Sequence, residues 1–263
     1  MIVYLATYPR SGHALTRGLI YRNFGFLVAS GYPEPRIKAK LKLRLREAPE
    51  PLPGFPPGLA WGDWTLVYRS PRTRQMQRLL NNDAHRWLTP DLRAELAAEA
   101  NLFFVKTHEP PQSDYLPGET AIQMVRHPAA ACASYLHMLI NFQPDAVASL
   151  AEIVRGTGVP GGGWSDYQEA WRAAALPKLL LRYEDLLADQ APAVREMARF
   201  LGLDPPSDVV DWPLEEARAA NPKRNPGAGL DGWRKDFSEE NLELLRHLHG
   251  AVAADFGYDL TGR

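Results

Sequence analysis

Three short segments, far apart in the chain, carry residue types that can act on an anionic substrate. The first is Tyr8-Pro9-Arg10-Ser11-Gly12. A phosphate group needs several backbone N–H groups directed at one place, together with a cation. Ser11 and Gly12 at a helix start would supply the N–H groups and a hydroxyl donor, and Arg10 would supply the charge. The alternative for this pentapeptide alone is an ordinary strand–turn–helix junction with a surface arginine.

The second segment is Lys106-Thr107-His108, which follows a short apolar run. A histidine whose pKa lies near neutrality can take a proton from a hydroxyl group at physiological pH. Lys106 beside it would stabilise negative charge that develops on a transferring group. The alternative is that His108 is an incidental loop histidine.

The third segment is Arg126-His127-Pro128, with Ser134 two helical turns further on. A cation at a strand end and a hydroxyl group brought beside it would clamp a second phosphate. Taken alone, an arginine before a helix start is the simpler interpretation. The first loop is not a Walker A motif, because no Gly-Lys-Ser/Thr follows at the required spacing, and this disfavours ATP- and GTP-hydrolysing P-loop proteins.

The hydrophobic pattern predicts the elements that must position these segments. Apolar runs predict buried strands at residues 2–7, 102–105, 121–125 and 179–183. Helical patterns and start signals predict helices at residues 12–24, 89–100, 128–139, 191–201 and 238–256. A strand, a tight loop and a helix at the start indicate an α/β protein with a central parallel sheet flanked by helices. Polar residues recur at the strand ends, where ligands bind in open α/β sheets.

Residues 31–58 interrupt this regular pattern. Within them, residues 36–46 alternate basic and apolar side chains, so that an extended strand would present every basic residue on one face. Two interpretations remain open: an edge strand protected by charge, and a basic wall for an anionic acceptor or partner. The segment from Pro49 to Pro57 is then a proline-rich connector or flap.

Composition limits the class of protein. A chain of 263 residues suits one large domain, and its net charge of −1 gives no global field toward nucleic acid or an acidic membrane. Cys132 is the only cysteine, which excludes an internal disulfide and fits a reducing compartment. No targeting segment and no apolar stretch of about 18 residues is visible, so we expect a cytoplasmic protein without a transmembrane span. No cluster with metal-ligand spacing is present either, and we expect no metal.

Together, six segments in order resemble the sulfotransferase family that uses 3′-phosphoadenosine 5′-phosphosulfate (PAPS), of the cytosolic and bacterial small-molecule type. Tyr8-Pro9-Arg10-Ser11-Gly12 is similar to the family's 5′-phosphosulfate loop, and Lys106-Thr107-His108 to its Lys-Thr-His segment. Arg126-His127-Pro128 to Ser134-Tyr135 resembles its 3′-phosphate motif. The other matching segments are Gly163-Trp164 to Trp171, Arg182-Tyr183-Glu184-Asp185-Leu186 with Phe200-Leu201-Gly202-Leu203, and Gly232-Trp233-Arg234 to Phe237-Ser238.

This resemblance implies a single sulfotransferase domain over residues 1–263 with a P-loop-like nucleotide-binding fold. It implies that PAPS is the donor, that 3′,5′-bisphosphoadenosine is the product, and that His108 is the general base, with Lys106 and Arg10 stabilising charge. The residues implied at the 5′ end of the donor are Arg10, Ser11, Gly12, His13, Ala14 and Leu15. Those implied around the 3′-phosphate and adenine are Arg126, Ser134, Tyr183, Arg224 and Gly227. The stretch His13-Ala14-Leu15 stands where the family usually has Thr-Thr-Trp, so Leu15 would offer the base only an aliphatic surface.

The implied reaction is in-line transfer of a sulfuryl group to a hydroxyl, or less favourably an amine, of a small-molecule, glycan or lipid acceptor. The proline-rich, partly basic insertion at about residues 31–78 is expected to form part of the acceptor site. Two alternatives are a non-catalytic nucleotide-binding member of the family and a P-loop-like phosphotransferase.

Overall fold

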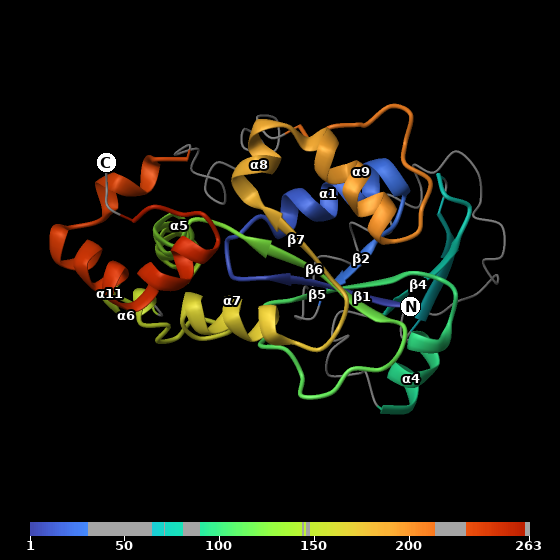
Figure 1. Ribbon diagram of the computed structural model, residues 1–263, viewed down its shortest axis with the longest axis horizontal. Coiled ribbons are helices and arrows are strands. Elements are labelled where there is room, and N and C mark those ends of the chain that lie inside the picture. Colours follow the sequence, from blue (N-terminus) through green and yellow to red (C-terminus); the bar gives the residue numbers. More distant parts are fainter. Residues whose placement is uncertain are drawn as a thin grey trace.

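The computed structural model describes residues 1–30, 65–70, 72–80, 90–143, 145, 148–213 and 230–260 (Figure 1). Its strands are β1 Ile2–Thr7, β2 Val28–Ser30, β3 Thr65–Arg69, β4 Met76–Leu80, β5 Phe103–Thr107, β6 Glu119–Val125 and β7 Lys178–Arg182. Its α-helices are α1 His13–Phe24, α4 Pro90–Ala98, α5 Pro128–Phe142, α6 Leu150–Val154, α7 Trp164–Ala173, α8 Tyr183–Ala188, α9 Gln190–Phe200 and α11 Glu239–Asp255, and a 3₁₀-helix, η2, covers Gly232–Asp236.

Five strands form one parallel sheet in the order β2-β5-β1-β6-β7, and β3 and β4 form a separate antiparallel pair. The sheet confirms the predicted α/β class. Because β1 lies between β5 and β6, the carboxyl ends of these three strands are adjacent. The register pairs Ala6 with Thr107 of β5 and Thr7 with Met124 of β6. The three chemically promising segments therefore leave the sheet side by side at one edge.

Helices cover both faces of the sheet, which explains why the central strands are apolar throughout. Figure 1 shows α1, α8 and α9 over one face and α7 over the other. Successive residues of β1 point to opposite faces. Val3 and Leu5 pack with side chains of α1 and α9, whereas Tyr4 and Ala6 pack with α5, α7 and α11.

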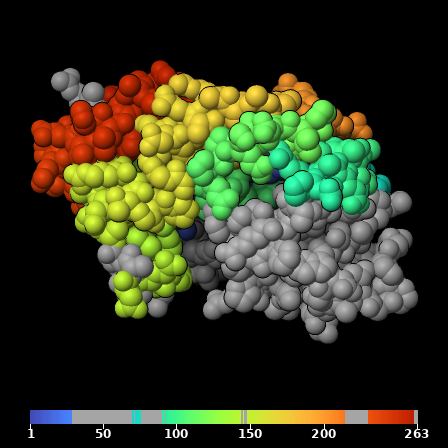
Figure 2. Space-filling view, turned by 90° about the horizontal axis from the view of Figure 1, so that it is seen from below, coloured from blue at the N-terminus to red at the C-terminus, as the bar shows by residue number. Residues whose placement is uncertain are grey.

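The C-terminal helix α11 closes one end of the molecule. It packs against α6 and α7, and Figure 2 shows the C-terminal segment beside these two helices. His249 of α11 is buried and ties the three helices together, because its Nδ1 lies 2.9 Å from Ser165 Oγ of α7 and its Nε2 lies 2.8 Å from the Val154 carbonyl oxygen of α6.

The predicted elements are present, with shifted ends. The predicted strand at residues 102–105 continues through Lys106 and Thr107, so both lie within β5. The predicted strand at 179–183 ends at Arg182, because Tyr183 begins α8. The alternating segment 36–46 and the proline-rich segment 49–57 lie outside the described residues. The described part of the 31–78 insertion includes β3 and the first residues of β4, which pair as a hairpin.

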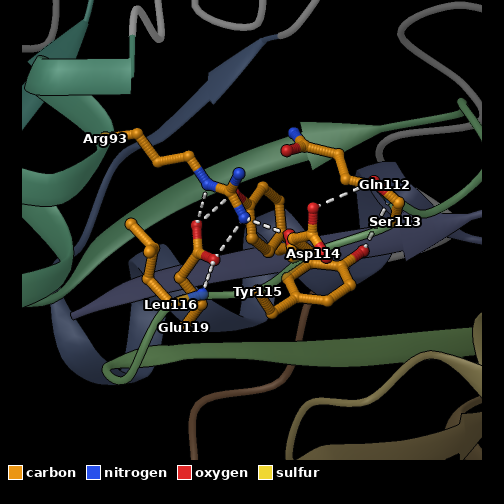
Figure 3. A network of polar contacts seen from close by, with 8 residues as sticks. Arg93, Gln112, Ser113, Asp114, Tyr115, Leu116 and Glu119 are labelled. Carbon is orange, nitrogen blue, oxygen red and sulfur yellow. Dashed lines mark hydrogen bonds and ion pairs between the residues drawn. The ribbon is translucent and has the colours of Figure 1, made fainter.

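A buried ion-pair network holds the opposite, amino-terminal edge of the sheet (Figure 3). Glu119 at the start of β6 accepts hydrogen bonds from Arg93 of α4 at 2.6 and 2.7 Å, from Tyr4 Oη at 2.7 Å and from the Leu116 N–H at 2.7 Å. Burial alone would raise the pKa of Glu119, but the hydrogen bonds from Arg93, Leu116 and Tyr4 outweigh it and lower that pKa. This carboxylate therefore stabilises the fold above its ordinary pKa, and the stabilisation is lost as the pH falls through the depressed value.

Replacement of Glu119 by alanine is expected to lower the free energy of unfolding by about 2 kcal/mol, because Tyr4, Leu116 and Arg93 lose their acceptor. Urea denaturation at neutral pH measures this loss. The matched control is Glu169→Ala, which removes an exposed carboxylate 3.5 Å from Arg172 and is expected to cost less than about 0.5 kcal/mol. Equal effects of the two substitutions would contradict the structural role of Glu119.

Candidate active site

The loop between β1 and α1 has the backbone shape of an anion-binding site. Arg10 has a φ of 67° and Gly12 a φ of 100°, so the chain makes two left-handed turns within three residues. The Ser11 N–H donates to the Tyr8 carbonyl oxygen at 3.1 Å. Gly12 then caps α1 without a side-chain hydrogen bond to the first helical turn. N–H groups at a helix start whose N-cap residue has no side chain, next to such a turn, form a concave site that favours an anion.

Ser11 supports this interpretation independently. Its side chain is fully buried, and its Oγ has no hydrogen-bond partner among the described residues. A buried hydroxyl group without a partner is costly, and it is usually explained by an absent water, ion or ligand.

Gly12 is needed for space as well as for its backbone conformation. A Cβ atom at this position would lie 2.6 Å from Cδ2 of Tyr183, the first residue of α8. The loop and the Tyr183 ring are therefore in close contact, and the ring forms one wall of the site.

Gly12→Ala is expected to lower the free energy of unfolding by about 2 kcal/mol, because it combines a left-handed φ with a clash. Gly202 offers a matched control, since its φ is 65° but a Cβ there meets no atom within 4 Å. Gly202→Ala is expected to cost only about 1 kcal/mol, from the backbone conformation alone. Chemical denaturation measures both, and a larger loss for Gly202→Ala would contradict the steric argument.

Two arginines connect the loop to β6 and α5. Arg126, directly after β6, donates from Nη1 to the Arg10 carbonyl oxygen at 2.7 Å. Its guanidinium carbon lies 4.5 Å from the centroid of the Tyr183 ring. Arg10 in turn donates from Nε to Ser134 Oγ of α5 at 3.0 Å. The fold thus gathers the predicted residues Arg10, Gly12, Arg126, Ser134 and Tyr183 at one place.

Further contacts hold Arg126 and the start of α5 in position. Trp164 of α7 donates from its indole N–H to the Arg126 carbonyl oxygen at 3.1 Å. Glu184 accepts from the His127 N–H at 3.0 Å and from Tyr258 Oη at 2.6 Å. The His127 ring stacks on Trp233 of η2, with centroids 4.9 Å apart. The segments that resembled the family only by sequence therefore converge around one strand end.

His108 is oriented by β1. Its Nδ1 lies 2.5 Å from the Thr7 carbonyl oxygen and 3.1 Å from Thr7 Oγ1. A carbonyl oxygen can only accept, so Nδ1 carries the proton and Nε2 of the neutral ring keeps its lone pair. Burial, and then the nearby Lys106 charge, lower the pKa of His108 to about 3, although the hydrogen bond to Thr7 opposes the shift. The ring is therefore neutral near pH 7.

A second imidazole lies against the first. His13 begins α1, and its ring centroid is 5.3 Å from that of His108 at an interplanar angle of 81°. Burial, followed by the charges of Lys106 and other neighbours, also lowers the pKa of His13 well below its ordinary value.

The remaining predicted residues have varied positions. Lys106 is buried near both histidines at the end of β5. Ala14 is exposed on the first turn of α1. The Leu15 side chain is only 3% exposed and belongs to the core between α1 and the sheet, so little of it is left for contact with a base. Arg224 and Gly227 lie outside the described residues.

Sequence reasoning did not assign a site role to Thr7 or Glu184. Thr7 is the last residue of β1 and orients His108, and Glu184 connects His127 to the C-terminal segment. The position of Thr7 at a strand end was a usable signal. The role of Glu184 required knowledge of which strands are neighbours.

The fold and the 8–12 loop define the class of protein: this is an α/β protein of the P-loop-like nucleotide-binding type. The sulfotransferase domain family model matches residues 3–248. The chain belongs to the sulfotransferase domain family.

Individual relatives are distant. Sulfotransferase 1E1 of Mus musculus is 27% identical over 150 residues, which are 52% of this chain and 50% of that protein. This chain therefore matches about half the length of that relative. The crystal structure of mouse sulfotransferase SULT7A1 complexed with PAP is similar with a TM-score of 0.54 and 16% identity, covering 97% of this chain and 88% of the other. Retinol dehydratase in complex with androsterone and inactive cofactor PAP gives a TM-score of 0.52 and 18% identity, covering 97% and 81%. At these identities the similarity concerns the fold.

Two further findings describe the chain. In the described ranges, no helix is long and apolar enough to cross a membrane. The same part of the chain contains no group of three or more His, Cys, Asp or Glu side chains placed to hold a metal ion.

Proposed function

We propose that this protein transfers a sulfuryl group from PAPS to a hydroxyl group of a small-molecule, glycan or lipid acceptor, with His108 as general base. The observation that carries this proposal is the convergence at the strand ends of the 8–12 loop, the Arg126–Arg10–Ser134 chain and the oriented His108. Membership of the sulfotransferase domain family supports the same reaction class.

The residues fit a donor that carries a phosphate at each end. Ser11 offers a buried hydroxyl group without a protein partner in the described ranges, next to the uncapped first turn of α1. Arg10, Gly12 and the backbone of His13 and Ala14 would hold the 5′ end. Arg126 and Ser134 would hold the 3′-phosphate and Tyr183 the adenine, whereas the parts proposed for Arg224 and Gly227 rest on the resemblance alone.

The chain's own groups account for the chemistry that the protein must supply. When bound, the donor would provide an activated sulfuryl group. His108 would take the acceptor proton at Nε2, because Nδ1 is committed to Thr7. Lys106 and Arg10 would stabilise the negative charge that develops during transfer. The hydrogen bond to Thr7 would keep the ring in one orientation, with Nε2 as the nitrogen that can accept a proton.

The acceptor would be bound in part by the insertion at about residues 31–78, which precedes β5 in the chain. This part of the proposal rests on the sequence, because most of that segment lies outside the described residues. We propose that the whole chain, residues 1–263, acts as one sulfotransferase domain.

A transfer assay with ³⁵S-labelled PAPS and a mixed panel of phenols, aliphatic alcohols, sugars and amines tests the proposed function. Calorimetry with 3′,5′-bisphosphoadenosine and with ATP accompanies it. We expect label transfer to a hydroxyl acceptor and a preference for the bisphosphate nucleotide. Bisphosphate binding without transfer to any acceptor would favour the non-catalytic alternative. A preference for ATP would favour a phosphotransferase.

A further inference from the structure

The two imidazoles at the strand ends are close enough to act on each other. His13 and His108 come from different elements, α1 and the end of β5, and their rings meet edge to face with centroids 5.3 Å apart. His108 is fixed through Nδ1 by Thr7 of β1. Both histidines are half-buried.

Among the residues that the structure describes, the charged side chains that act on this pair are cations. Lys106 of β5 and Arg10 of the loop act on both rings, and Arg17 of α1 acts on His13. Burial, and then these positive charges, make a proton on either ring unfavourable. The neutral form of each ring is the one that prevails at neutral pH before an anion binds.

We propose that His13 is a positioning residue for the base: its neutral ring stabilises the proton that His108 takes from the acceptor and restricts the His108 ring to one orientation. This inference rests on the proposed sulfuryl transfer. In that reaction the acceptor O–H bond breaks and its proton moves to Nε2 of His108. The acceptor oxygen bonds to sulfur as the sulfur–oxygen bond to the nucleotide breaks, and the electron pair of that bond leaves on the nucleotide phosphate.

The physical reason is the charge that His108 acquires. An imidazolium in a site lined by cations needs a nearby group that can accept a hydrogen bond, and a neutral imidazole has one nitrogen that can do so. The backbone N–H of His13 would remain part of the donor loop. The side chain thus has a task separate from donor binding.

The variants His13→Phe and His13→Gln separate the effect of the side chain on His108 from donor binding by the backbone. Phenylalanine keeps an aromatic ring but has no nitrogen, whereas glutamine keeps a polar group of similar reach. For His13→Phe we expect turnover to fall roughly tenfold while the affinity for 3′,5′-bisphosphoadenosine changes less than about twofold. His13→Gln is expected to retain most of the activity. The control is His247→Gln, which changes an exposed histidine on α11.

A direct measurement does not depend on turnover. Nuclear magnetic resonance of ¹⁵N-histidine-labelled protein follows the protonation of His108 between about pH 2 and 8, with and without 3′,5′-bisphosphoadenosine. The nucleotide is expected to raise the pKa of His108 in the wild type, because its charge offsets Lys106 and Arg10. In the nucleotide-bound state His13→Phe is expected to lower the His108 pKa by about one unit, because the imidazolium loses its hydrogen-bond acceptor.

Three results would overturn the inference. One is an equal His108 pKa in wild type and His13→Phe. Another is unchanged turnover in His13→Phe. The third is a loss of nucleotide affinity as large as the loss of turnover, which would make the side chain a donor ligand. Absence of transfer by the wild type would contradict the proposed function instead, and the titration would still decide the role of His13.

Discussion

Replacement of His108 by alanine is expected to reduce turnover roughly 10³-fold, the scale of general-base catalysis. Its Nε2 is the base atom in the proposed mechanism, since Nδ1 donates to Thr7. Nucleotide binding should survive, because the proposed phosphate contacts come from the 8–12 loop, Arg126 and Ser134. Steady-state transfer assays measure turnover, and calorimetry with 3′,5′-bisphosphoadenosine measures binding.

Two variants make this result interpretable. His247→Ala removes an exposed histidine from α11 and is expected to leave turnover unchanged. Thr7→Val removes the side-chain oxygen at 3.1 Å but keeps the carbonyl contact, so only a small loss is expected. Near-normal turnover in His108→Ala would show that another group takes the proton.

Arg126→Ala is expected to weaken binding of 3′,5′-bisphosphoadenosine by about 3 kcal/mol, or roughly 100-fold. The substitution removes a charge from the proposed 3′-phosphate site. It also removes the hydrogen bond to the Arg10 carbonyl oxygen at 2.7 Å and the contact with the Tyr183 ring. Calorimetry at constant ionic strength measures the affinity.

Arg126→Lys and Arg195→Ala complete this comparison. Lysine keeps the charge but not the planar fork, so it should recover only part of the lost affinity. Arg195 is exposed on α9, and its replacement controls for loss of one positive charge. If Arg126→Ala bound the nucleotide as tightly as the wild type, the 3′-phosphate would have to lie elsewhere.

Much of the parallel sheet was predictable, because its strands are short apolar runs buried on both faces. β1, β5, β6 and β7 were found to within one or two residues. β2, the hairpin of β3 and β4, and the helices α6, α7 and α8 were missed. Most of these elements are short, and their stability comes from tertiary neighbours more than from local preference. α8 is an example, since it begins at Tyr183 directly from β7 without a turn.

The site, like the fold, was predictable only in part. The loop at residues 8–12 was recognisable from its sequence because Arg10, Ser11 and Gly12 are contiguous. The position of the Leu15 side chain was not readable from the sequence: it packs in the core between α1 and the sheet, since a helix turns each successive residue by about 100°.

The sequence by itself determined the segments that carry charge and their positions at strand ends, because apolar runs and the polar residues that follow them are local features. Only the tertiary structure decided which of these segments meet. The strand order places β1 between β5 and β6, and this order brings Thr7 to His108, Arg126 to Arg10 and His13 to His108. Residues about 100 positions apart become neighbours through that order, which no local pattern encodes.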